Sequence, residues 1–206
     1  MGPKYEFTDE TMNHNGHLLH RIRRLSDGKL GGWIETEDNL SQEGDCWVGN
    51  NAKVYGDAKV YNHGIAYGNA EVYDNAEIYD CAEVRGNALV YDNAKVYSHA
   101  KVYDDAQVYD NAQVYGNAEI SGNAQVYGNA EVHGDTIVYG NARIYDRASV
   151  RDDAAVYGNA QVYGNAQVYD NAKVYGNAEV YDNAQVYGNA TVYLFDEICN
   201  EDKVIE

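Results

Sequence analysis

Three residues of this sequence that could do chemistry, His63, Cys81 and His99, follow one another at intervals of 18 residues. If the chain winds so that residues 18 apart lie above one another, their side chains form a column with a spacing of roughly 5 Å, the strand spacing of a β-sheet. Imidazole and thiolate are ligands that zinc prefers, and a thiol beside an imidazole can act as a nucleophile. These three residues are therefore weak candidates for a metal site.

Histidine is also the residue type best suited to act as a catalytic base in this chain, and the weak candidates are His63, His99 and His133. The alternative is that the column marks a series of chain corners. Its later members are Asn117, Asp135 and Asp153, which are residue types that turns favour. The corner interpretation is the favoured one, so we predict neither a metal nor a cofactor.

A second column combines tyrosine with aspartate. Tyrosine recurs every 18 residues from Tyr55 to Tyr181, and aspartate is frequent at the position that follows it. Aromatic rings and carboxylates on one flat surface could bind a sugar, a cation or a basic protein. The candidate binding residues are Tyr73, Tyr91, Tyr109, Tyr127, Asp74, Asp92 and Asp110. The alternative is structural: stacked rings cover the strands, and aspartate serves as a turn residue.

Three apolar residues occupy positions where the pattern predicts outward side chains: Trp47, Ile65 and Ile137. We expect them to share one face with His133. Exposed apolar residues on an otherwise polar surface mark interaction sites. The sequence therefore predicts an interface on this face, and a homotrimer is one assembly that it could form.

A repeat of six residues must position all of these side chains. From Val48 to Val192 the chain reads V-x-x-x-A-x, with the consensus V-Y-G-N-A-x. Six residues match no helical face, but within A-x-V-Y the Ala and Val point to one side of a strand and x and Tyr to the other. Gly-Asn or Asp-Asn then makes a corner. The pattern predicts an all-β, single-domain parallel β-helix with a narrow core of Val and Ala.

The spacing of an aliphatic residue and a small residue four positions later, as in Val54 and Ala58, resembles the hexapeptide-repeat, left-handed β-helix family. The stretch from Leu30 to Val48, followed by NAKVYGDAKVY, looks like the YdcK-like, transferase-related proteins of bacteria and phages. This resemblance implies a triangular left-handed solenoid with three hexads, or 18 residues, in each coil. Residues 30–191 would then form about nine coils, a rod of roughly 40 Å.

The ends of such a rod are edge strands that need covers. We expect residues 1–29 to form an N-terminal hairpin cap around Asn15-Gly16, a strong hairpin signal. We expect residues 192–206, which are rich in large apolar side chains, to form a C-terminal cap. Between them, the phase of the repeat predicts inward side chains at Leu30, Ile34, Leu40 and Cys46.

The formal net charge of −18 argues against nucleic acids and acidic membranes as partners and fits a basic protein partner. The first residues do not resemble a signal peptide, and no run of about 18 apolar residues could span a bilayer. Three cysteines at unrelated spacings fit reduced thiols better than a disulfide framework. We therefore expect a cytoplasmic protein.

Three function classes remain. The first is a non-enzymatic structural or protein-interaction module, a stiff acidic rod that needs no site beyond what the repeat provides. The second is an acidic decoy that imitates the phosphate line of a nucleic acid and inhibits a basic host protein. The third follows from the resemblance, which implies an acyl-CoA-dependent acyltransferase with a histidine base and loops that shape the pocket. The absence of any insertion between Val48 and Val192 departs from that pattern, so we favour a protein without enzymatic activity.

Overall fold

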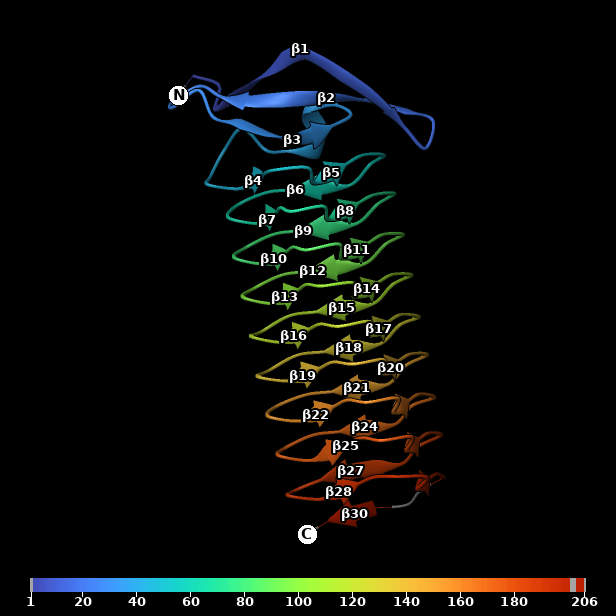
Figure 1. The fold of residues 1–206 in the computed structure, drawn as a ribbon. Helices are drawn as coiled ribbons and strands as arrows, with labels where there is room; N and C mark the ends of the chain where they lie inside the picture. The colour runs from blue at the N-terminus through green and yellow to red at the C-terminus, as the bar shows by residue number, and fades with distance from the viewer. Residues whose placement is uncertain (1, 201–202, 206) are drawn as a thin grey trace.

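The computed structural model describes residues 2–200 and 203–205 and shows a β-solenoid of about nine turns (Figure 1). Within these residues the structure is all-β, apart from one turn of 3-10 helix, η1 (Glu37–Asn39). No helix in the described part of the chain is long and apolar enough to cross a bilayer. The predicted fold class is therefore confirmed, whereas the left-handed winding stays a prediction from the resemblance.

Three parallel sheets form the sides of the solenoid. Sheet A contains β3 (Leu30–Ile34), β5 (Lys53–Val54), β8 (Glu71–Val72), β11 (Leu89–Val90), β14 (Gln107–Val108), β17 (Gln125–Val126), β20 (Arg143–Ile144), β23 (Gln161–Val162), β26 (Glu179–Val180) and β29 (Glu197–Ile198). Sheet B contains β6 (Lys59–Val60), β9 (Glu77–Ile78), β12 (Lys95–Val96), β15 (Gln113–Val114), β18 (Glu131–Val132), β21 (Ser149–Val150), β24 (Gln167–Val168), β27 (Gln185–Tyr187) and β30 (Lys203–Ile205). Sheet C contains β4 (Trp47–Val48), β7 (Ile65–Ala66), β10 (Glu83–Val84), β13 (Lys101–Val102), β16 (Glu119–Ile120), β19 (Ile137–Val138), β22 (Ala155–Val156), β25 (Lys173–Val174) and β28 (Thr191–Val192).

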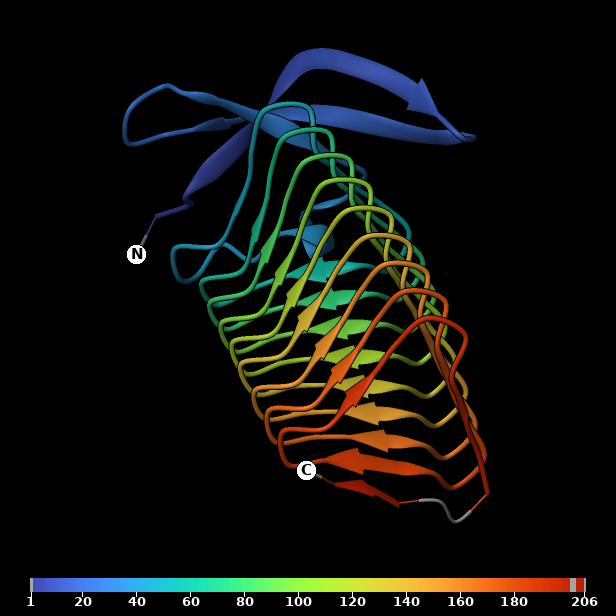
Figure 2. The same ribbon diagram turned by 60° about the horizontal axis from the view of Figure 1, so that its bottom comes forward.

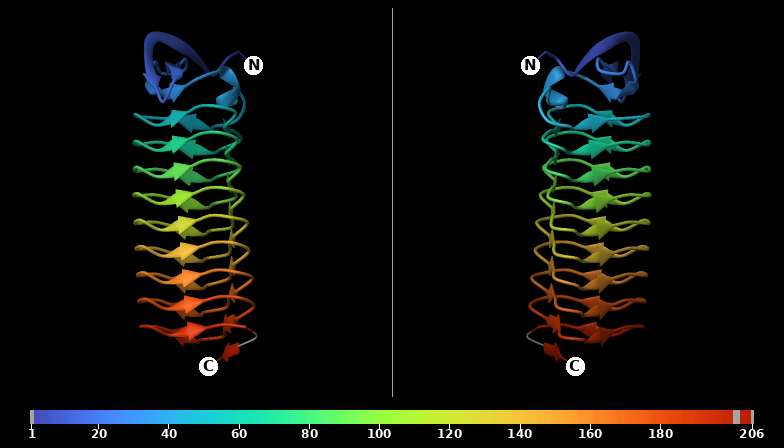
Figure 3. Two further views of the ribbon diagram at one scale, coloured as in Figure 1. Left: turned by 90° about the vertical axis from the view of Figure 1, so that its right-hand side faces the viewer. Right: turned by 90° about the vertical axis from the view of Figure 1, so that its left-hand side faces the viewer.

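Each strand pairs with the strand 18 residues later, so three hexads make one coil. Val90 lies beside Val72 on one side and beside Val108 on the other. The backbone amide of Leu89 donates to the carbonyl oxygen of Ala106 at 3.0 Å, and equivalent bonds follow at the other coils. The coils therefore stack as evenly spaced layers (Figure 3).

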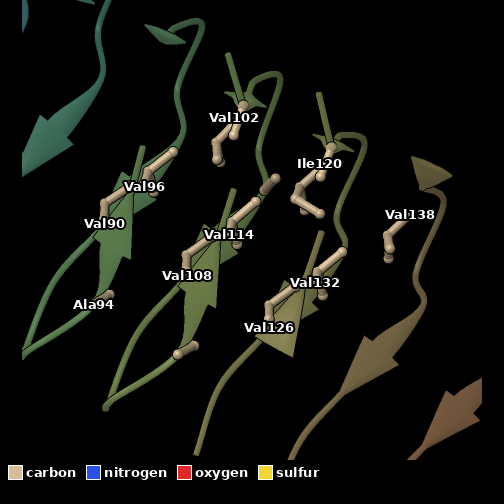
Figure 4. Packing of buried hydrophobic residues seen from close by; sticks show 14 of the residues in the cluster. Val90, Ala94, Val96, Val102, Val108, Val114, Ile120, Val126, Val132 and Val138 are labelled. Atoms are coloured by element: carbon tan, nitrogen blue, oxygen red, sulfur yellow. The ribbon is translucent and has the colours of Figure 1, made fainter. Parts of the chain in front are cut away.

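The core is a narrow column of Val over Val and Ala over Ala. The inward side chains of the coils between Ala52 and Val192 are almost completely buried (Figure 4). Isoleucine replaces valine at residues 78, 120 and 144, and Thr136 takes an alanine position, where its hydroxyl donates to the carbonyl oxygen of His133 at 2.7 Å. Small β-branched and alanine side chains suffice because the column is too narrow for larger ones.

The corners need a left-handed backbone, which explains the Gly, Asp and Asn of the repeat. Gly134 has φ +81°, and a Cβ atom at this residue would lie 2.6 Å from the amide nitrogen of Asp152. At equivalent corners, Asp92 and Asp110 adopt φ of 55° and 57°. Asp and Asn tolerate this conformation better than other residues with a side chain.

The N-terminal cap is an antiparallel hairpin of β1 (Tyr5–His14) and β2 (His17–Arg24), with its turn at Asn15-Gly16 as expected. The hairpin lies across one end of the coil stack (Figure 2). Ile34, Leu40 and Cys46 are buried as predicted, but Leu30 is 43% exposed. That prediction was wrong because Leu30 pairs antiparallel with Arg23 of the hairpin, so the parallel register begins only at Trp33.

At the other end, β29 and β30 extend sheets A and B in parallel register. The segment therefore adds to the last coil, and Leu194 and Phe195 at its first corner are 59% and 80% exposed. Residues 201, 202 and 206 of the expected C-terminal cap lie outside the described residues. The boundaries of the expected caps at residues 29 and 192 stay predictions.

The tight core predicts that it will not accept a larger residue. We expect Ala124→Leu to lower the free energy of unfolding by about 1–3 kcal/mol, because an added isobutyl group must displace stacked valines. Gln125→Leu is the matched control: it changes the next residue, whose side chain points outward, and we expect it to leave stability within about 0.5 kcal/mol. Urea denaturation followed by circular dichroism measures both. Equal loss in the two variants would contradict the packing of the core.

Candidate functional site

Eight tyrosines form a continuous ladder on sheet A, from Tyr55 to Tyr181. Successive ring centroids are 4.8–5.1 Å apart, and the interplanar angles do not exceed 6°. This ladder contains four predicted binding residues: Tyr73, Tyr91, Tyr109 and Tyr127. Sheets B and C carry shorter ladders, which are interrupted at Arg151 and at Ser121. Strand stacking alone positions these rings, since each follows an inward valine or isoleucine.

The stacking limits what the ladder can bind. Each inner ring is covered on both faces by its neighbours, so a sugar could reach only ring edges and hydroxyl groups. Burial, together with neighbouring phenols and carboxylates, raises the pKa of Tyr73, Tyr91 and Tyr109 to about 12. These phenols are therefore neutral at physiological pH. The geometry favours a structural role for the rings.

The aspartates beside this ladder also have structural contacts. Asp92 Oδ2 accepts a hydrogen bond from the amide of Asp110 at 3.2 Å, and Asp110 Oδ2 accepts one from the amide of Gly128 at 3.0 Å. Each carboxylate thus satisfies a backbone amide of the next coil. Asp74 has the same left-handed backbone, with φ 56°. The predicted binding role of these three aspartates is untested, and one oxygen of Asp92 and of Asp110 is already engaged.

The column of His63, Cys81 and His99 lies at the corner between sheets B and C. Cys81 is exposed, and His63 Nδ1 lies 3.6 Å from Asp45 Oδ2 with both side chains largely in solvent. His63 and Cys81 border a shallow depression of about 660 Å³, yet no hydrogen bond joins the two side chains. Among the described residues, no three His, Cys, Asp or Glu side chains are placed to hold a metal ion.

The four predicted interface residues do not share one face. His133 belongs to the ladder of sheet B, where its ring stacks on Tyr115 at 4.5 Å and burial lowers its pKa. The other three residues belong to sheet C, across a corner. Trp47 is only 8% exposed because the guanidinium group of Arg24 lies 4.3 Å from its ring centroid. Trp47 is therefore a contact of the cap, which corrects the prediction, whereas Ile137 is exposed.

The largest hollow of the described surface is a groove of about 1050 Å³ between the hairpin tip, η1 and β6. Its lining includes four carboxylates, Glu35, Asp38, Asp57 and Glu77, and one lysine, Lys59. Asp38 and Asp57 are exposed, and neither forms a hydrogen bond or ion pair with another described residue. Two acidic groups in the groove are thus available to a ligand.

The other two carboxylates are held in place. Burial alone would raise the pKa of Glu35, but a hydrogen bond of 2.8 Å from the amide of Gly56 and the nearby His17 hold it below its ordinary value. His17 Nδ1 lies 2.9 Å from Glu35 Oε2. Glu77 accepts a hydrogen bond from the hydroxyl of Tyr61 at 2.8 Å. Glu35 and Glu77 therefore form a negative, rigid lining of the groove.

The hairpin tip is fixed to the solenoid by a second histidine. His14 Nε2 lies 2.9 Å from Glu71 Oε2, and Lys53 Nζ lies 2.9 Å from Glu71 Oε1. Burial would raise the pKa of Glu71, but His14 and Lys53 lower it overall. Histidines of the cap thus pair with acidic groups of the rod, as the sequence suggested in general terms.

Sequence reasoning missed this groove because its residues come from the hairpin, from η1 and from two coils. The irregular stretch between Ile34 and Leu40 was the available signal. Asn39 is buried there: its side-chain amide donates to the carbonyl oxygens of Gly56 and Ala58 at 2.9 Å, and its Oδ1 accepts from the amide of Thr36 at 2.8 Å. An asparagine in the middle of an apolar phase indicates a local departure from the hexad.

The comparison with known families concerns the repeat. Residues 124–140, 166–182 and 184–194 match a family model described as the YdcK beta solenoid repeat. The resemblance to YdcK-like β-helix proteins is thereby confirmed for the repeat region. No curated protein matches the chain at a significant level. The groove lies outside the matched residues, so its chemistry must be argued from its own geometry.

The lowered pKa values of Glu35 and Glu71 predict that acid releases the hairpin tip. A carboxylate whose pKa is lowered by folding stabilises the folded state above its ordinary pKa of about 4.5, and this stabilisation is lost as pH falls through the lowered value. We therefore expect amide hydrogen exchange of β1 and β2, corrected for intrinsic rates, to increase between pH 5 and about pH 3.

Two variants test the cause. Glu71→Gln should increase exchange in the hairpin already at pH 7, with an effect of about 1 kcal/mol or less because the pairs are partly exposed. Glu119→Gln removes a carboxylate that pairs with Lys101 far from the cap, and it should leave the hairpin unchanged. Equal exchange in the hairpin of both variants would contradict the assignment.

Proposed function

We propose that the protein is a non-enzymatic interaction module, a stiff solenoid that binds a cationic segment of a protein partner in the groove beside its cap. The groove is the observation that carries the proposal. It combines the largest hollow of the described surface with two fixed carboxylates, Glu35 and Glu77, and two exposed ones, Asp38 and Asp57. A lysine or arginine side chain supplies the complementary charge and hydrogen-bond donors.

The distribution of charge supports a cationic partner. Acidic residues concentrate at two corners of the solenoid, whereas the sheet faces mix acidic, basic and amide side chains. The corner between sheets A and B carries Asp57, Asp74, Asp92, Asp110, Asp146 and Asp182. The corner between sheets B and C carries Asp45, Asp80, Asp135, Asp152, Asp153 and Asp170. These columns attract a basic molecule along the rod and raise its encounter rate.

An acyltransferase receives less support from the geometry. The coils between Val48 and Val192, all of them described, follow the 18-residue register without extruding a loop. His63 and His99 lie at exposed corners, and His133 is stacked within a tyrosine ladder. None of the three lines the groove. A binding module requires no histidine base and no loop, so it fits the described surface better.

A nucleic-acid decoy also receives less support. Phosphates follow one another every 3.4 Å or so along a strand of DNA, whereas the coils repeat at about 4.8 Å, the spacing of β-strands. Several corner aspartates, such as Asp92 and Asp110, already accept backbone hydrogen bonds. The corners therefore do not reproduce the spacing or the free oxygens of a phosphate line.

The proposal predicts that a basic peptide binds in the groove. Fluorescence anisotropy with a labelled octa-lysine peptide, in low salt and again in high salt, provides the measurement. We expect Asp38→Asn/Asp57→Asn to weaken binding by about 5- to 10-fold, since each exposed ion pair contributes about 0.5–1 kcal/mol. High salt should weaken binding to the unsubstituted protein.

Asp135→Asn/Asp153→Asn is the matched control, because it removes the same charge from a corner remote from the groove. We expect an effect below about twofold for this variant, from long-range attraction alone. If both double variants lose the same affinity, the peptide binds the rod's charge as a whole, and the proposed site is wrong. Absence of binding in low salt would contradict the function itself.

A further inference from the structure

The exposed apolar residues of the described chain gather in two places. Three of the eight large ones belong to the cap and its junction: Leu18, Leu25 and Leu30. The other five lie on the C-terminal half of sheet C and the corner that follows it: Ile137, Tyr139, Tyr193, Leu194 and Phe195. Sheets A and B carry none of the eight. Apolar exposure on the solenoid is thus confined to one side of the rod.

The same surface lacks carboxylates. We call it the acid-free face, and it consists of the outward residues of β19, β22, β25 and β28, the four tyrosines that follow them, and the corner residues up to Phe195. Lys173 is its one charged residue, in a chain with 33 Asp and Glu. Its corner carries an uncharged amide ladder, in which Asn141 donates to Asn159 at 3.0 Å and Asn159 donates to Asn177 at 2.9 Å.

The corner at Leu194 and Phe195 is costly for the isolated rod. The three preceding coils place Gly-Asn at this corner, at residues 140, 158 and 176, whereas the last coil places Leu-Phe there. Leu194 adopts φ 63°, a conformation that disfavours a branched apolar residue. Its side chain is also largely in solvent. Neither the turn nor the core accounts for these two residues, which indicates a contact outside the chain.

We propose that the acid-free face is where a second copy of this chain packs side by side with the first. Two copies, each with a net charge of −18, repel one another over most of their surface. At this face they can approach without opposing carboxylates, and both copies present tyrosine edges, amide groups and apolar side chains. A basic partner would find no acidic group here, so the face differs in chemistry from the groove of the proposed function.

The size of the face sets the strength of the contact. A strand and its corner span about 20 Å, and four coils at about 4.8 Å give a height of about 19 Å. The area is therefore roughly 400 Å² on each copy, about half that of a standard stable interface. The pairing should accordingly be weak and reversible, with a dissociation constant on the order of 100 μM.

Sedimentation equilibrium of the full chain, from about 10 μM to about 1 mM, tests the pairing in the range expected for a small interface. We expect association that strengthens as NaCl is raised, because salt screens the repulsion between the acidic corners while the acid-free contact itself carries no ion pair. A chain that stays monomeric at the highest concentration and salt, or an association that weakens with salt, would overturn the proposal.

Two substitutions locate the contact. Ala155→Glu places a carboxylate in the middle of the face, and we expect it to weaken association at least about 10-fold because two such charges oppose one another in the pair. Gln125→Glu makes the same charge change at the equivalent strand position of sheet A and should have little effect. Equal behaviour of these two variants would overturn the proposed location.

A double variant separates association from folding. Leu194→Gly/Phe195→Asn restores the corner of the preceding coils, and it should raise the thermal midpoint of the monomer while weakening association. Gly removes the strain of the left-handed leucine, so a loss of association cannot be ascribed to unfolding. Undiminished association of this variant would show that the corner does not take part in the contact.

Discussion

The structure depends on one constraint: every coil must return to the same register after 18 residues, so that inward side chains stack on their own kind. The backbone bonds between coils, such as Leu89 to Ala106, hold only if each hexad has the same length and the same corner. A column of Val and Ala satisfies this condition because the side chains are alike at each level. The uniform core thus explains both the lack of inserted loops and the scarcity of large apolar residues.

This constraint leaves the variable chemistry to the outside. Outward strand positions hold Glu, Gln, Lys or an apolar residue, and the tyrosines often donate to them, as Tyr163 does to Glu179 at 3.1 Å. The corners admit only residues that tolerate a left-handed backbone at their first position, so aspartate becomes the natural carrier of negative charge there. The segregation of acidic corners from the acid-free face therefore follows from the turn chemistry and from which corners chose glycine instead.

Much of this could be predicted from the sequence, because a strict repeat converts one local pattern into a whole fold. The inward positions of Ile34 and Leu40, the hairpin turn at Asn15-Gly16 and the coil length all agree with the structure. The failures lie where the repeat ends. Leu30 follows the phase of the hexads but pairs with the hairpin, and Trp47 is covered by Arg24. The groove was missed for the same reason, since it forms between the cap and the first coils and depends on docking, not on periodicity.

The placement of the two tryptophans has an optical consequence. Trp33 and Trp47 both lie at the cap end, each beneath a guanidinium group, of Arg21 and Arg24 respectively. The rest of the rod contains only tyrosine chromophores, stacked closely enough to exchange excitation along a ladder. Light absorbed by the phenols can therefore migrate toward the indoles, and the emission of the whole molecule reports the state of the junction between hairpin and solenoid. The protein thus carries an intrinsic fluorescent reporter at the end where its groove lies.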